Sequence, residues 1–145
     1  MTPDPSSSRP RLWWRRARRE RAARLALLEA GDAVELPCKG RRTTSRGWGE
    51  WVDGRLRLPD SAAPDHASFV VDDPSAVALV TRQGAAPVVL EPPLEVSVRP
   101  VRYRAEAFHG PEAEIVVAVS ERRTVELALP PDEVDRVARR LADRT

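Results

Sequence analysis

The sequence predicts a mainly β fold, a bent antiparallel sheet or small barrel, with a basic helix at the N-terminus and one helix at the C-terminus. From residue 32 onward, short apolar runs alternate with turn residues, which is typical of an all-β domain. Residues 131–143 instead show helical spacing, and residues 11–30 form an arginine-, tryptophan- and leucine-rich stretch without turn residues. With 145 residues, the chain suits one domain plus an appendage.

The N-terminal segment divides into a tail and a helix. Residues 1–10 are rich in proline and serine and are predicted to be a disordered tail. Residues 11–30 are predicted to form a basic amphipathic helix, and Gly31 is a natural stop for it. The apolar stripe of this helix is interrupted by Arg21 and consists of Trp14, Ala17, Leu25 and Leu28.

A β-rich domain is predicted over residues 31–145. Alternating apolar residues predict a first strand over 34–39, followed by a basic loop over 40–46. Asp53-Gly54 lies between two extended runs, 47–52 and 55–59, and this dipeptide is a strong signal for a two-residue hairpin turn.

The register of that hairpin assigns its two faces. Trp51 shares the apolar face with Leu56 and Leu58, so it is predicted to be a core residue. Trp48 is predicted to lie on the outer face, beside a cross-strand pair between Glu50 and Arg57.

Further strands and a second hairpin follow. Strands are predicted at Ala67–Val71, Ala76–Thr81, Val88–Leu90 and Leu94–Arg104. Residues 108–111 are predicted to be a loop, and residues 114–119 and 124–129 a hairpin. Its predicted apolar faces are formed by Ile115, Val117 and Val119 on the first strand and by Val125, Leu127 and Leu129 on the second.

A helix over residues 131–143 is predicted to close the domain. Pro131 suits a first helical turn, and Asp132 lies where the helix dipole favours an acid. The residues expected to pack on the sheet recur at i, i+3, i+4 and i+7 and are Val134, Val137, Ala138 and Leu141.

This order of short strands, final hairpin and terminal helix resembles the bacterial pleckstrin-homology-like domains, of the kind found in small actinobacterial proteins behind a short N-terminal anchor. The resemblance covers residues 32–145. It implies a strongly bent sheet or barrel closed at one end by the helix. It also implies that the loop after the first strand binds an anionic ligand, such as a lipid headgroup, or a partner protein. The residues at that position are Lys39, Arg41, Arg42, Arg46 and Trp48.

Charge is distributed unevenly along the chain. Residues 1–30 carry eight arginines and three acidic residues, a net charge of +5, whereas the remaining residues carry a net charge of −3. A cationic arm on a mildly acidic body indicates contact with a polyanion, either an anionic membrane surface or nucleic acid. The residues predicted to make this contact are Arg11, Trp13, Trp14, Arg15, Arg16, Arg18 and Arg19.

Little in the sequence indicates catalysis. The chain has two histidines 43 residues apart, one cysteine (Cys38) and no recognisable nucleophile, metal-binding or nucleotide-binding motif. We therefore expect a non-catalytic binding or adaptor module, with no metal and no cofactor. The single cysteine and the shortness of the apolar runs favour a cytoplasmic protein, peripheral at the inner face of the membrane if the arm binds lipid.

Three roles remain open for the arm. It binds a membrane surface, or it binds nucleic acid, or it docks on a partner protein through Leu25, Leu27 and Leu28. Burial of the leucines with Trp13 and Trp14 left exposed would favour the first two roles. Burial of the tryptophans as well would favour the third.

Overall fold

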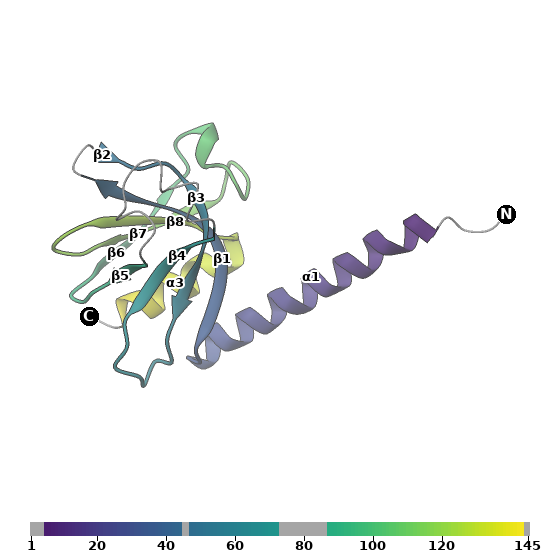
Figure 1. Cartoon of the computed structure of the whole chain (residues 1–145), viewed down its shortest axis with the longest axis horizontal. Helices are drawn as coiled ribbons and strands as arrows, with labels where there is room; N and C mark the ends of the chain where they lie inside the picture. Colours follow the sequence, from purple (N-terminus) through teal and green to yellow (C-terminus); the bar gives the residue numbers. More distant parts are fainter. Residues whose placement is uncertain (1–4, 45–46, 73–86, 144–145) are drawn as a thin grey trace.

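The computed structural model describes residues 5–44, 47–72 and 87–143. A long helix, α1, precedes a curved antiparallel sheet, and a second helix, α3, ends the chain (Figure 1). The elements are α1 (Pro5–Ala30), β1 (Val34–Thr44), β2 (Gly47–Trp48), β3 (Val52–Leu58), β4 (Ala67–Val71), β5 (Val88–Leu90), β6 (Glu95–Pro100), a 3₁₀ turn η2 (Arg104–Glu106), β7 (Glu114–Val119), β8 (Thr124–Ala128) and α3 (Pro131–Ala142). The predicted mainly β fold with a helix at each end is confirmed.

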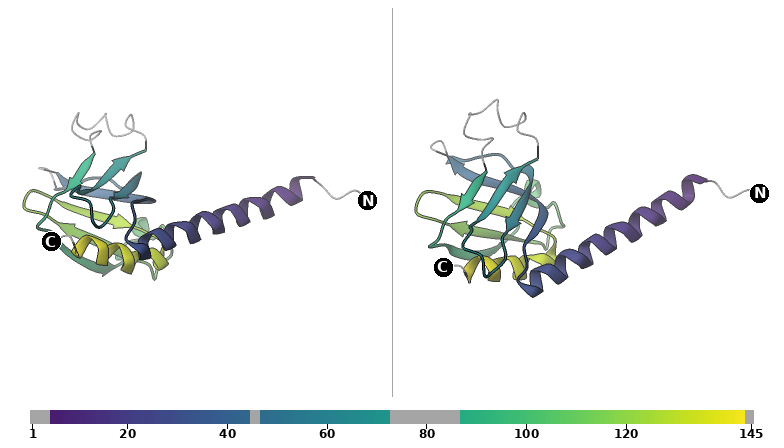
Figure 2. Two further views of the ribbon diagram at one scale, coloured as in Figure 1. Left: turned by 90° about the horizontal axis from the view of Figure 1, so that it is seen from below. Right: turned by 60° about the horizontal axis from the view of Figure 1, so that its bottom comes forward.

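The sheet consists of two meanders joined by their terminal strands. Its order is β5-β4-β3-β1-β8-β7-β6, and β2 pairs only with the end of β1. The strand β1 pairs with β8, antiparallel, so the first and last strands of the domain are neighbours. Figure 2 shows that the sheet curves strongly and that α3 lies against one end of it, beside the last turns of α1.

The core lies inside the curve of the sheet. Leu36, Leu56 and Leu127 come from three neighbouring strands and are fully buried. The helix α3 packs on β6 and β7 and contributes the predicted stripe, with Val134, Val137 and Leu141 buried and Ala138 partly buried. Because these buried residues follow the helical period, α3 could be predicted from the sequence.

The hairpin predicted at Asp53-Gly54 is wrong. The strand β3 runs straight through this dipeptide, with Gly54 opposite Cys38 of β1. A Cβ atom on Gly54 would lie 2.5 Å from the ring of Phe69, so this glycine makes room for an aromatic ring inside the sheet. Gly54 is not among the glycines with positive φ, which both central residues of a type I′ hairpin turn would need.

Two consequences of that hairpin are also wrong. Trp51 precedes β3 and is only partly buried, so it is not a core residue. Arg57 lies opposite Glu35 of β1 and pairs with it at 2.8 Å, in place of the predicted partner Glu50.

The segment 40–46 is not a loop over most of its length. The strand β1 continues to Thr44, and the predicted loop residues lie in its ladder with β3 and β8. In the second hairpin, which is confirmed, the core face of β7 is formed by Val116 and Ala118 and not by Val117 and Val119.

Other boundaries differ from the predicted ones. The helix α1 begins at Pro5, so residues 5–10, predicted to be disordered, are helical. The strand β6 ends at Pro100, four residues before its predicted end. The strand predicted at Ala76–Thr81 lies outside the described residues.

The end of α1 is the one predicted. Gly31 has a φ of +76°. Its N–H donates to the carbonyl of Leu28, and the N–H of Asp32 donates to the carbonyl of Leu27. This pair of bonds is a Schellman cap, which needs a residue in the left-handed region, and glycine adopts that region at no steric cost.

Candidate functional site

Most of α1 projects away from the body as an arm (Figure 1). We define the arm as residues 5–23, the part of α1 before its contacts with the body. Leu12, Trp13 and Trp14 are 64%, 66% and 59% exposed. The two indole rings lie edge to face, with their centroids 5.9 Å apart. Large apolar side chains this exposed, next to one another, are typical of a surface that contacts another molecule.

The predicted arginines of the arm are also solvent-exposed. Arg15, Arg16, Arg18 and Arg19 are exposed, and none of them pairs with a carboxylate in the described part of the chain. Arg11 lies within α1, but its side chain is outside the described part. The four exposed arginines therefore present their positive charge to solvent with no ion-pair partner among the described residues.

The two kinds of side chain occupy different sides of the arm. Successive residues of an α-helix are about 100° apart, so Trp14 falls on the same side as the docked Leu25 and Leu28, and Trp13 falls about 60° beyond Leu28. By the same geometry, Arg15 and Arg19 fall on the opposite side, and Arg16 and Arg18 lie on the two flanks. Residues 12–19 together form a belt of aromatic and cationic groups around the arm.

The last turns of α1 attach the arm to the body. Leu28 is buried and Leu25 is partly buried against the core, whereas Leu27 remains 37% exposed. The attachment uses the leucines and leaves Trp13 and Trp14 in solvent. This is the first of the two arrangements set out above, except that Leu27 stays partly in solvent.

The second predicted site, on the body, is arranged differently. Lys39 lies in β1, where its ammonium is 2.8 Å from the carboxylate of Asp53 and 5.0 Å from the ring centre of Phe108. Phe108 in turn lies edge to face with Trp51. The positive charge of Lys39 is thus already paired within the domain.

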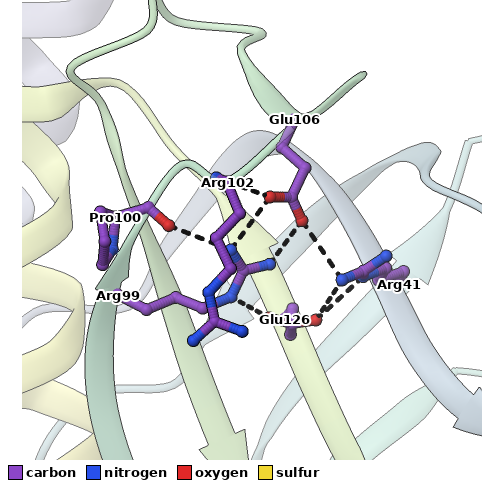
Figure 3. Close-up of polar contacts among 6 residues, drawn as sticks. All are labelled: Arg41, Arg99, Pro100, Arg102, Glu106 and Glu126. Carbon is purple, nitrogen blue, oxygen red and sulfur yellow. Dashed lines mark hydrogen bonds and ion pairs between the residues drawn. The ribbon is translucent and has the colours of Figure 1, made fainter. Parts of the chain in front are cut away.

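Arg41 belongs to a buried ion network on the outer face of the sheet (Figure 3). Its guanidinium is 2.7 Å from Glu126 of β8 and 3.2 Å from Glu106 of η2. Arg99 of β6 pairs with the same two carboxylates. The indole of Trp51 covers the guanidinium of Arg41 at 4.8 Å. Two cations meet two anions here, so the network as a whole is neutral.

The electrostatics of this network follow from its pairing. The guanidinium of Arg99 lowers the pKa of Glu106 from 4.5 to about 2, and the backbone N–H of Arg102 contributes by donating to the same carboxylate at 3.1 Å. The hydrogen bond to Glu106 also raises the pKa of Arg99. The network ties the segment carrying Glu106 onto the sheet, and it offers no free charge to a ligand.

Arg42 differs from its neighbours, because it lies on the core-facing side of β1 near the end of the strand. No carboxylate in the described part of the chain pairs with it. Burial lowers its pKa first, and the nearby charge of Arg123 lowers it further. Arg123 and the exposed Arg122 lie in the turn between β7 and β8. These two arginines were not among the predicted site residues. Their position in a predicted hairpin turn is the sequence signal that could have identified them.

The remaining predicted body residues are only partly described. Arg46 and the side chain of Trp48 lie outside the described part of the structure. Of the three predicted body-site residues whose side chains are described, Lys39 and Arg41 have partners within the domain, and Arg42 lies beside further cationic groups.

In the ranges that the structure describes, no three His, Cys, Asp or Glu side chains lie close enough to hold a metal ion. Cys38 is buried, and burial raises its pKa to about 12, so it carries no thiolate at neutral pH. Partial burial lowers the pKa of His109.

Two further findings concern membranes and relatives. Among the described residues, no helix combines the length and the apolar character needed to cross a bilayer. No family model matches the chain, and no curated protein and no solved structure shows significant similarity to it.

Proposed function

We propose that this protein is a non-catalytic binding module that associates with an anionic membrane surface through its arm. The observation that carries the proposal is the belt of residues 12–19, in which exposed tryptophans and unpaired arginines lie together on a projecting helix. Tryptophan favours the interface between headgroups and hydrocarbon, and arginine is attracted by anionic headgroups. The protein would then be peripheral at the inner face of the membrane.

The magnitudes fit reversible binding. Each basic residue near an anionic surface contributes about 1 kcal/mol. The arginines Arg15, Arg16, Arg18 and Arg19 face different directions, so about half of them reach a flat surface at one time. If the arm approaches by its free end, the tryptophans and several arginines enter the headgroup layer together. Affinity would then decrease as salt increases.

The strand order supports the resemblance to pleckstrin-homology-like domains. A four-strand meander (β1, β3, β4, β5) is followed by a three-strand meander (β6, β7, β8), and a helix ends the chain. On this proposal, the body engages a second anionic group or a partner through Arg42, Arg122 and Arg123. These residues replace Lys39 and Arg41, whose charges are neutralised inside the domain.

Nucleic-acid binding is the second candidate function. It is favoured by the clustering of Arg15, Arg16, Arg18 and Arg19 within about half of the circumference of the arm. A helix with cations over such an arc can lie against two rows of phosphates. In this case Arg15 and Arg19, opposite the tryptophans, would contact the phosphates of a duplex. Trp13, Trp14 and Trp48 would be available to stack on unpaired bases, which an intact duplex does not offer.

Vesicle co-sedimentation of the full chain tests the proposal. We expect binding to anionic vesicles that falls with salt and is absent with neutral vesicles. The double variant Trp13→Ala/Trp14→Ala should bind the anionic vesicles at least tenfold more weakly. A variant with Arg55→Gln and Arg57→Gln on the body removes the same kind of charge away from the arm and should bind as the parent does.

Duplex DNA added as a competitor separates the two candidates. If DNA displaces the protein from vesicles and binds equally well to Trp13→Ala/Trp14→Ala, the nucleic-acid function replaces the membrane function. If neither vesicles nor DNA bind in a manner that depends on the arm, both candidates are excluded.

A further inference from the structure

The junction between α1 and α3 holds the end of the arm from several sides. The buried guanidinium of Arg140 in α3 donates to the carbonyls of Asp32 and Pro59, both at 2.7 Å, and to that of Gly31 at 3.4 Å. One side chain thereby joins the end of α1, the start of β1 and the end of β3. Ser61 adds a backbone N–H that donates to the carbonyl of Gly31 at 2.9 Å.

The connection at Gly31 is closely packed and hydrogen-bonded. A Cβ atom on Gly31 would lie 2.7 Å from the hydroxyl oxygen of Ser61. The Schellman cap at Gly31 fixes the backbone between α1 and β1. A pivot of the arm at this glycine would break the cap and the bonds to Arg140 together.

A second contact is the ion pair between Arg24 of α1 and Glu133 of α3, at 3.2 Å. Glu133 is fully buried, and its second carboxylate oxygen has no hydrogen-bond partner in the described part of the structure. A buried carboxylate satisfied on one side only is a poor source of stability. The pair instead restrains the orientation of α1, because Arg24 reaches the buried carboxylate in the angle and rotation that α1 has here.

A third contact lies at the surface, where Arg136 of α3 donates two hydrogen bonds to Glu29 of α1, at 2.6 and 2.9 Å. The contacts of Arg24 and Glu29 lie on opposite sides of the buried Leu28. Together with Arg140 they restrain α1 in angle and in rotation about its own axis.

We propose that this junction is an orienting clamp that holds the arm at one fixed angle to the body. Arg140, Glu133 and Arg136 are its positioning residues. A molecule or surface that binds the arm would therefore also determine which face of the body points away from it. The clamp is a property of the free protein and does not depend on the identity of what the arm binds.

Pulsed electron spin resonance on the full chain tests the clamp. Spin labels at Arg16→Cys on the arm and Val89→Cys on β5 report the distance between arm and body, and both positions are exposed. Buried Cys38, whose thiol stays protonated at neutral pH, should remain unlabelled in the parent chain. We expect a single narrow distance distribution in the absence of any vesicle or nucleic acid.

Variants of the clamp should widen this distribution. Arg140→Lys keeps the charge but loses the planar fork that reaches several carbonyls, and it should widen the distribution at least twofold. Arg136→Gln breaks only the surface pair and should widen it less. Lys39→Gln, which breaks the surface pair with Asp53 further along β1 and β3 from the junction, should leave the width unchanged.

The outcomes decide the proposal without reference to binding. A broad or multiple distribution in the labelled parent would overturn it, and so would an unchanged width in both clamp variants. If Arg140→Lys does not fold, the parent and Arg136→Gln still give the answer. Failure of vesicle binding would leave the result intact, so the clamp and the proposed function fail separately.

Discussion

The arm and the outer face of the sheet are both rich in arginine, yet they use it in opposite ways. On the arm, Arg15, Arg16, Arg18 and Arg19 stand in solvent with no carboxylate partner among the described residues. On the sheet, Arg41 and Arg99 are largely buried and share two carboxylates. Cations of the first kind are available to a ligand, and cations of the second kind hold the domain together.

The difference arises from where the acids lie along the chain. The arm has Glu20 as its one acidic residue, and among the described residues no acid of the body forms an ion pair with Arg15, Arg16, Arg18 or Arg19. Arg41 instead meets Glu106 and Glu126, which are 65 and 85 residues away in sequence. A cluster of basic residues therefore indicates free charge only when folding brings no acids to it.

The largest effect should come from opening the buried network. Glu126→Gln leaves Arg41 and Arg99 without one of their two shared anions, and breaking a buried ion pair costs about 3–5 kcal/mol. We expect a decrease of this size in the free energy of unfolding, measured by urea denaturation. Arg16→Gln on the arm should change it by less than about 0.5 kcal/mol. Equal effects of the two substitutions would contradict the comparison.

Acid should weaken the same network by a comparable amount. The pKa of Glu106 is about 2 in the folded protein and 4.5 ordinarily, so the folded state binds its proton less readily than the unfolded state. The resulting stabilisation, about 3 kcal/mol, is present above pH 4.5 and is lost as the pH falls toward 2.

Thermal unfolding between pH 6 and pH 2 measures this dependence, with Glu106→Gln as the reference. The variant should be less stable than the parent at pH 6 and should approach it at pH 2. A constant difference between the two proteins at all pH values would show that Glu106 acts through packing and not through its charge.

Elements that depend on local sequence patterns could be predicted, whereas features that depend on tertiary contacts could not. The helix over residues 11–30, the presence of the final hairpin and α3 depend on local patterns, such as the stripe ending in Leu141, and they were predicted correctly. The helical start at Pro5 and the core face of β7 were not. The turn at Asp53-Gly54 was not, because a glycine that accommodates the ring of Phe69 looks the same in sequence as a glycine that turns the chain. As a result, the strand predicted over 55–59 begins three residues earlier in the structure, as β3 (Val52–Leu58).

The contacts of the predicted body-site residues could not be predicted for a related reason. Lys39, Arg41 and Arg42 form one basic run in sequence, but alternation along β1 sends Arg42 to the face opposite Lys39 and Arg41. Their partners come from η2, β3 and β8, and only the tertiary fold reveals them. The exposure of charges on a helix that projects into solvent can be predicted without knowledge of the tertiary fold.

A smaller effect is expected at the junction between arm and body. Arg24→Met leaves the carboxylate of Glu133 buried without its cation, and this should destabilise the fold by about 2 kcal/mol at pH 8. Burial already raises the pKa of Glu133, and loss of Arg24 should raise it further. A raised pKa in the folded state means that stability is lost as the pH increases, so the cost should shrink toward pH 5.

Urea denaturation at pH 5 and pH 8 checks this expectation, and a second substitution provides the control. Adding Glu133→Leu removes the stranded carboxylate and should restore most of the lost stability at pH 8. If Arg24→Met costs the same at both pH values, the carboxylate of Glu133 is not the source of the effect.

The smallest expected effect distinguishes the position of a positive charge on the molecule from the net charge of the protein. Arg16→Gln and Arg57→Gln each remove one positive charge, the first from the arm and the second from an exposed pair with Glu35. An exposed ion pair contributes little, so Arg57→Gln should change stability by about 0.5 kcal/mol or less. If the arm alone contacts the membrane, Arg16→Gln should weaken binding to anionic vesicles about fivefold, which corresponds to ~1 kcal/mol per basic residue, while Arg57→Gln leaves it unchanged. An equal loss in both variants would mean that net charge drives binding and that the arm has no special part in it.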